Sequence, residues 1–143
     1  MISRKGDPVP WKRRPVVRAA YLLTYLFFFV AGIFAFFYPA QAILDALKSS
    51  LTYAWAGFLT VGGGLAMWSP LRNTWSGELI GLPLLSASHM IFGLALLGFG
   101  KTAAAIAVGL VFCGIGSGFI GRWLEIRGKA KMLRGVGNGS ADS

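Results

Sequence analysis

Four long stretches without a charged residue follow one another along the chain. A helix needs about 20 apolar residues to cross the ~30 Å hydrocarbon layer of a bilayer. Apolar residues run continuously through these stretches, which is typical of lipid-facing helices and not of a globular core. The sequence therefore predicts an all-α fold, an integral membrane four-helix bundle with spans at about residues 19–38, 50–69, 79–99 and 102–122.

Proline and glycine set the expected limits of the first two spans. Pro39 cannot continue a helix, so the first span should end near residue 38. The following segment carries Asp45 and Lys48 and could form a short amphipathic turn at the membrane surface. Glycines 62–64 should locally weaken the second span.

Short polar links should join the later spans, and basic tails should flank the bundle. The loop 69–77 predicts a tight hairpin, and the link at Gly100 and Lys101 makes the third and fourth spans antiparallel neighbours. Residues 1–18 form a basic, proline-containing tail, and residues 19–126 hold the bundle. Residues 127–143 form a second basic tail for which we expect disorder.

The distribution of charge predicts how the chain is threaded. Fourteen Lys and Arg face five acids, for a net charge of +9, and twelve of the fourteen lie in the two tails and in the loop at Arg72. Only Lys48 and Lys101 lie in the other two loops. Because basic loops stay on the cytoplasmic side, both termini should be cytoplasmic, in the cytoplasmic membrane. The expected partner is a bilayer with anionic headgroups, not nucleic acid or a small-molecule substrate.

A cleavable signal peptide is the competing interpretation of the first span, since Ala40, Gln41 and Ala42 resemble a cleavage site. The apolar segment of a signal peptide spans about 7–15 residues. Here the apolar run before Pro39 has 20 residues, which favours a retained helix. Tyr21 and Tyr25 would place amphipathic rings near a membrane interface.

Three polar residues fall on one stripe of the third span. Glu78, Ser86 and His89 are spaced i, i+8 and i+11, so we expect this stripe to face protein and not lipid. His89 could belong to a proton relay or line a pore. It could instead fix packing by a hydrogen bond to Thr60 or Ser117. We favour packing, because no second titratable group lies at similar depth.

Glu78 lies in the first turn of the third helix, where a carboxylate complements the free N–H groups and the helix dipole. Arg72 could pair with it across the loop, and an ion-coordinating mouth is the functional alternative. Aromatic and basic residues near the ends of the spans are expected to anchor the chain at the interface: Trp68, Arg72, Trp75, Arg122 and Trp123.

Small residues recur on one side of the fourth span. Gly114, Gly118 and Gly121, at i, i+4 and i+7, leave a nearly bare backbone that another helix can approach closely. The partner helix could lie within the bundle or in another copy of the chain, and we favour the bundle. If the partner helix belongs to another copy, the glycines would join copies into a homo-oligomer. In both cases their role is helix packing.

Residues that could support catalysis are scarce. One histidine and one cysteine, Cys113, allow no intrachain disulfide and no Cys-based metal cluster, and no phosphate-binding loop occurs. We therefore predict no catalytic, metal or cofactor site, and a chain that is not an enzyme.

The segment 51–85 resembles small four-span membrane proteins of phages that infect actinobacteria, identified as holins. The resemblance rests on the opening Leu51-Thr52-Tyr53, on glycines 62–64, and on Trp75 followed by Gly77 and Glu78. It implies a subunit that accumulates in the cytoplasmic membrane, oligomerises and permeabilises it during host lysis. The alternatives are an accessory or scaffolding membrane protein that binds a partner through its helices, and a small proton or ion channel.

Overall fold

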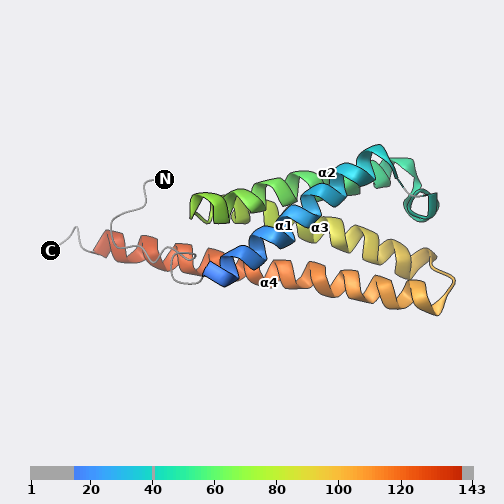
Figure 1. Cartoon of the computed structure of the whole chain (residues 1–143). Coiled ribbons are helices and arrows are strands. Elements are labelled where there is room, and N and C mark those ends of the chain that lie inside the picture. Colours follow the sequence, from blue (N-terminus) through green and yellow to red (C-terminus); the bar gives the residue numbers. More distant parts are fainter. Residues whose placement is uncertain (1–14, 40, 140–143) are drawn as a thin grey trace.

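Four α-helices make up the described chain (Figure 1). The computed structural model describes residues 15–39 and 41–139. Its helices are α1 (Pro15–Phe37), α2 (Gln41–Arg72), α3 (Ser76–Phe99) and α4 (Ala103–Gly139). Close backbone approach occurs between α1 and α2, between α2 and α3, and between α3 and α4. No strand occurs in these two ranges, and the all-α prediction is confirmed.

Three of the helices are long and apolar enough to cross a membrane. These are α1, α3 and the segment Ala103–Lys129 of α4, with mean hydropathies of 2.1, 1.8 and 2.1. The helix α2 contains the predicted second span but falls outside this group, because glycine, threonine, tyrosine and tryptophan dilute its apolar residues. The chain is thus a membrane protein with three helices of spanning character.

Helix limits differ from the predicted ones at the start of the chain and around the first two connections. The first helix begins at Pro15 and not near residue 19, because proline suits the first helical position, where no intrahelical N–H bond is needed. The second runs unbroken from Gln41 through Arg72, so a separate surface turn before residue 50 is absent. The side chains of Asp45 and Lys48 lie outside the described part.

The connection between α2 and α3 is shorter than the predicted loop. Only residues 73–75 join the two helices, and Asn73 adopts a left-handed backbone with φ of 52°. Asparagine tolerates this conformation better than most residues, which permits so tight a reversal. The predicted hairpin is therefore present, with its turn confined to three residues.

The C-terminal segment is helical where we expected disorder. The helix α4 continues to Gly139 and extends past the ends of the other three helices (Figure 1). No proline follows Pro83, and residues 127–134 consist mostly of good helix formers such as Lys, Arg, Ala, Met and Leu. The prediction of disorder is wrong up to Gly139, and residues 140–143 lie outside the described part.

Glycines set the close approach of helices that follow one another. Between α1 and α2, a Cβ added at Gly63 would lie 2.7 Å from the backbone N of Phe29. Between α2 and α3, a Cβ at Gly81 would lie 2.6 Å from the backbone O of Gly62. Small residues let helix backbones approach closely where lipid supplies no hydrophobic driving force. The glycine run of α2 is therefore a contact surface and not a weak point.

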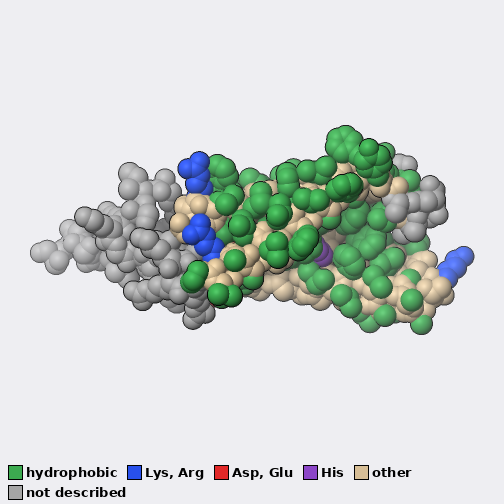
Figure 2. Space-filling model, in the orientation of Figure 1, with side chains coloured by type: hydrophobic (Ala, Val, Ile, Leu, Met, Phe, Trp, Pro, Cys, Tyr) green, Lys and Arg blue, Asp and Glu red, His purple; other side chains and the backbone are tan. Residues whose placement is uncertain are grey.

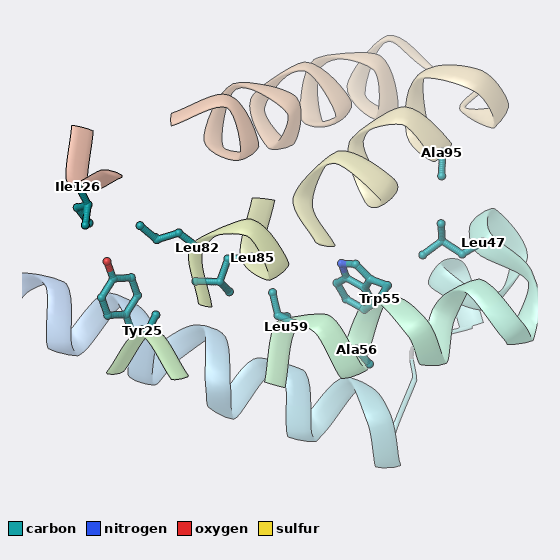
Figure 3. Close-up of a cluster of buried hydrophobic side chains, with 10 residues drawn as sticks. Tyr25, Leu47, Trp55, Ala56, Leu59, Leu82, Leu85, Ala95 and Ile126 are labelled. Atoms are coloured by element: carbon teal, nitrogen blue, oxygen red, sulfur yellow. The ribbon is translucent and has the colours of Figure 1, made fainter. Parts of the chain in front are cut away.

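Buried side chains lie mainly between α2 and α3, with contributions from α1 and α4. Figure 3 shows Tyr25 of α1 pointing toward Leu82 of α3 and Ile126 of α4, all three at most 1% exposed. Helix α3 is the most covered of the three spanning helices and α4 the least. Figure 2 shows hydrophobic side chains over the length of the described surface, with Lys and Arg toward its two ends. A surface of this kind suits acyl chains in the middle and headgroups at the ends.

Candidate functional site

A buried polar cluster lies at the end of the bundle where α1 and α3 begin. Glu78, in the first turn of α3, is fully buried. The hydroxyl of Tyr25 on α1 donates to Glu78 Oε1 at 2.6 Å. The Glu78 backbone N–H donates to Ser69 Oγ of α2 at 2.7 Å. Since Trp75 offers no side-chain cap to α3, Ser69 satisfies one of the free N–H groups of that helix end.

Arg122 of α4 faces the same carboxylate from the other side. Its Nη2 lies 3.9 Å from Glu78 Oε2, and its Nη1 donates to Glu125 Oε2 at 3.0 Å. The guanidinium also lies over the ring of Tyr21, 5.3 Å from its centroid. Lys129 pairs with Glu125 one turn further along α4. We call Tyr25, Ser69, Glu78 and Arg122 the Glu78 cluster, which takes one residue from each helix.

Electrostatics explains why these groups occur together. A buried carboxylate without partners costs several kcal/mol, so it must be hydrogen-bonded and placed near a positive charge. Tyr25 supplies a strong O–H donor and Arg122 supplies the positive charge. Glu78 Oε2 is buried without a hydrogen-bond partner in the described part of the chain, so it depends on the nearby Arg122 charge. Removing Tyr25 or Arg122 would leave the carboxylate with still less compensation in an apolar surrounding, so the cluster ties α1 and α4 to α3.

The predicted pair between Glu78 and Arg72 is wrong. Arg72 is exposed and lies over the ring of Trp68, 4.5 Å from its centroid. The reason is the tight turn after α2, which brings Ser69 and not Arg72 to the start of α3. Arg72 and Trp68, which is 50% exposed, remain available for the headgroup region as predicted anchors.

His89 lies in an aromatic surrounding deeper in the bundle. It is 2% exposed, and its ring makes edge contact with Phe28 of α1 at 4.8 Å and with Phe119 of α4 at 5.3 Å between centroids. Phe112 stacks on it at 5.6 Å. Its Nδ1 lies 2.7 Å from the carbonyl O of Leu85, so the ring N–H donates to its own helix. His89 thus fills the space between α1 and α4.

The predicted hydrogen-bond partners of His89 are wrong. Thr60 donates to the carbonyl of Ala56, and Ser117 donates to the carbonyl of Cys113, each within its own helix. A hydroxyl in a membrane helix readily bonds to the carbonyl one turn back, which removes the need for a distant partner. Packing, the role that we favoured for His89, comes from rings rather than from an interhelical hydrogen bond.

Ser86 completes the predicted stripe on α3. Its hydroxyl donates to the carbonyl O of Gly116 on α4 at 2.9 Å. Ser86, Glu78 and His89 are 4%, 0% and 2% exposed, in agreement with the expectation that the stripe faces protein. Each of the three has its own partners, and their hydrogen bonds do not connect them to one another as a relay.

The glycines predicted to pack on α4 face open space. Nothing described lies within 4 Å of a Cβ added at Gly114, Gly118 or Gly121, and all three are exposed. The favoured contact within the bundle is therefore absent from the described part of the chain. Gly109 and Gly116 make the close contacts with α3 instead. Contact with another copy stays a prediction.

The remaining anchors lie at the same end as the Glu78 cluster. Trp123 is partly buried, and its Nε1 donates to the carbonyl of Leu79 at 3.0 Å. Arg127 lies over the Trp123 ring, 4.5 Å from its centroid. Trp75, half-buried, precedes α3. Trp123 thus fastens α4 to the first turn of α3.

Sequence reasoning missed the most important member of the site. Tyr25 was expected near the interface, yet it is fully buried against Glu78. The available signal was the position of Tyr25, which lies one to two turns inside the predicted first span and not at its end. The sequence alone did not place α1 beside α3.

No protein-family model, curated protein or solved structure matches this chain. Within the described residues, no group of three His, Cys, Asp or Glu could hold a metal ion. The candidate site therefore has to be interpreted from its geometry alone. It consists of the Glu78 cluster and of His89 with its aromatic neighbours, both inside a set of apolar helices.

Proposed function

We propose that this chain is a holin-like, non-enzymatic protein of the cytoplasmic membrane that assembles with copies of itself and permeabilises the membrane during host lysis. The proposal rests on the resemblance of residues 51–85 to such proteins together with the geometry of α4. It includes four spans with both termini in the cytoplasm.

The four-span topology is supported by the position of α2. This helix packs along both α1 and α3, which are long and apolar enough to cross a bilayer. A helix packed between two spanning helices covers the same depth, so its polar groups are shielded by protein and not by water. Arg18, Arg72 and Arg122 lie at the end that carries the Glu78 cluster, whereas Lys101 lies at the opposite end. This asymmetry favours a cytoplasmic Glu78 end.

One observation carries the proposed assembly: α4 is the least covered spanning helix and presents a bare glycine face. A single copy keeps its intramembrane polar groups Glu78, Ser86 and His89 inside. Such a copy is compatible with lipid and leaves the bilayer sealed. Close helix packing at Gly114, Gly118 and Gly121 would then join copies, and pores would form only after copies accumulate.

The test is to induce the chain in a bacterium and to follow membrane potential and optical density. We expect an abrupt loss of potential after a delay. Gly118→Leu should delay or abolish that loss, because a leucine fills the open face between copies. Gly57→Leu is the matched control, since a Cβ added at Gly57 on α2 meets nothing described within 4 Å.

Other outcomes contradict the proposal and identify its alternatives. A potential that never collapses at high expression indicates an accessory or scaffolding protein. A graded ion flux without lysis indicates a small channel. If the membrane potential is lost after the same delay in Gly118→Leu and in the unsubstituted chain, the glycine face has no role in assembly.

A further inference from the structure

We call the contact between two neighbouring helices a seam. The three seams between consecutive helices are closed by glycines, whereas α1 meets α3 and α4 through side chains alone in the described part of the chain. The α1/α2 seam has Gly32 and Gly63, the α2/α3 seam has Gly62 and Gly81, and the α3/α4 seam has close contacts at Gly93, Gly109 and Gly116. In contrast, no Cα of α1 lies within 8 Å of a Cα of α4 in the described residues. The α1/α4 seam is therefore closed by side chains alone.

Long side chains bridge this seam at two levels. At the level of the Glu78 cluster, Arg122 of α4 lies over Tyr21 of α1. One to two turns deeper, the rings of Phe28 and Phe119 meet edge to face with centroids 5.6 Å apart. Figure 1 shows α1 running obliquely, with its N-terminal end beside α4 and its C-terminal end along α2.

The polar groups of the interior lie directly behind this seam. His89 contacts Phe28 on one side and Phe119 on the other, so the two rings that close the seam also cover the histidine. Glu78 accepts from Tyr25 of α1 and faces Arg122 of α4. Parting α1 from α4 would uncover both residues without breaking any glycine contact.

We infer that the α1/α4 seam is the part of the chain that opens, and that Tyr25, Glu78 and Arg122 form the clasp that keeps it closed. The clasp works because Glu78 needs both partners. Tyr25 donates to Oε1, whereas the buried Oε2 has no hydrogen-bond partner among the described residues and is compensated only by the Arg122 charge 3.9 Å away. When one partner is lost, water is the replacement, and it enters between α1 and α4. This inference rests on the proposed function, because it identifies the place at which the permeabilising protein would open.

The experiment measures how well water-soluble reagents reach position 89. The full chain carries Cys113→Ser and His89→Cys in every variant and is placed in phospholipid vesicles. We compare the rate at which a small charged thiol reagent labels the introduced cysteine. Tyr25→Phe and Glu78→Gln should each raise the rate about tenfold or more, the effect expected for losing a hydrogen bond to a charged group.

Tyr53→Phe is the matched control, because Tyr53 is exposed on α2 and lies outside the clasp. It should leave the rate unchanged. If Glu78→Gln fails to fold, as circular dichroism would report, Tyr25→Phe carries the test alone, since it removes only one hydroxyl. Equal labelling rates in Tyr25→Phe and Tyr53→Phe overturn the clasp, whether both rise or neither does.

The labelling experiment is independent of lysis. Faster labelling in Tyr25→Phe together with cells that keep their membrane potential would retain the clasp and reject the holin proposal. Unchanged labelling together with abrupt collapse of the potential would reject the clasp and retain the holin proposal. If the clasp and the holin proposal are both correct, Tyr25→Phe should also make the potential collapse earlier in induced cells.

Discussion

Gly81 offers the sharpest test of how α2 and α3 pack. A Cβ added there would lie 2.6 Å from the backbone N of Ala66, 2.6 Å from the backbone O of Gly62 and 2.9 Å from the Ala66 Cβ. Ordinary contacts between such atoms are about 3.5–4.0 Å. Backbone atoms cannot rotate away as a flexible side chain can, so Gly81→Ala should force the two helices about 1 Å apart.

The magnitude follows from two opposing effects. Overpacking of a well-packed contact costs about 1–3 kcal/mol. Alanine also favours helix over glycine by about 1 kcal/mol, which partly offsets that cost. Gly98 is the matched control on the same helix, because nothing described lies within 4 Å of an added Cβ there. Gly98→Ala should therefore be neutral or stabilising, and the two variants should differ by about 1–3 kcal/mol.

The measurement is unfolding in mixed micelles of a mild detergent with increasing dodecyl sulfate, followed by far-UV circular dichroism. We expect Gly81→Ala to unfold at a lower fraction of dodecyl sulfate than Gly98→Ala. A difference of 1–3 kcal/mol corresponds to about 5–150-fold in the unfolding equilibrium constant. If Gly81→Ala proves as stable as Gly98→Ala, α2 and α3 do not approach each other at this point.

Two further predictions concern α4 contacts and topology. Ser86→Ala removes the hydrogen bond to Gly116 and should lower the free energy of unfolding by about 1 kcal/mol, whereas Ser117→Ala, an exposed control, should change it by less than about 0.5 kcal/mol. Equal effects of the two substitutions in the same micelle titration would argue against the α3/α4 contact. A protease-sensitive tag appended to either end should be cut only after intact cells are permeabilised, and cleavage from outside would reverse the proposed orientation.

The helical content and the apolar spans were predictable because they depend on local properties. Continuous apolar runs predict helices that avoid water, and Pro39 ends the first of them within one residue of the predicted point. The inward direction of Glu78, Ser86 and His89 also follows from spacing on one helix. Helix ends were less predictable, because Pro15 and the basic residues after 127 are both compatible with helix.

The partners of these side chains depended on the tertiary structure. Glu78 bonds to Tyr25, 53 residues away, and faces Arg122 on another helix, while the nearby Arg72 turns to Trp68. Spacing within one helix does not reveal which face meets a neighbour. On α4, Gly116 packs against α3 whereas Gly114 and Gly118, two residues to either side, face open space.

The sequence by itself determined that this chain consists of apolar helices, that most of its basic residues lie in the terminal segments, and that three polar groups of α3 turn inward. The tertiary structure decided which helices meet through glycine backbones, which helices meet through side chains alone, and which residues lie against Glu78. The physical reason is the distance along the chain over which each effect acts. Hydropathy and helix geometry act within one segment, whereas the pairing of a buried carboxylate depends on how separate segments are placed in space.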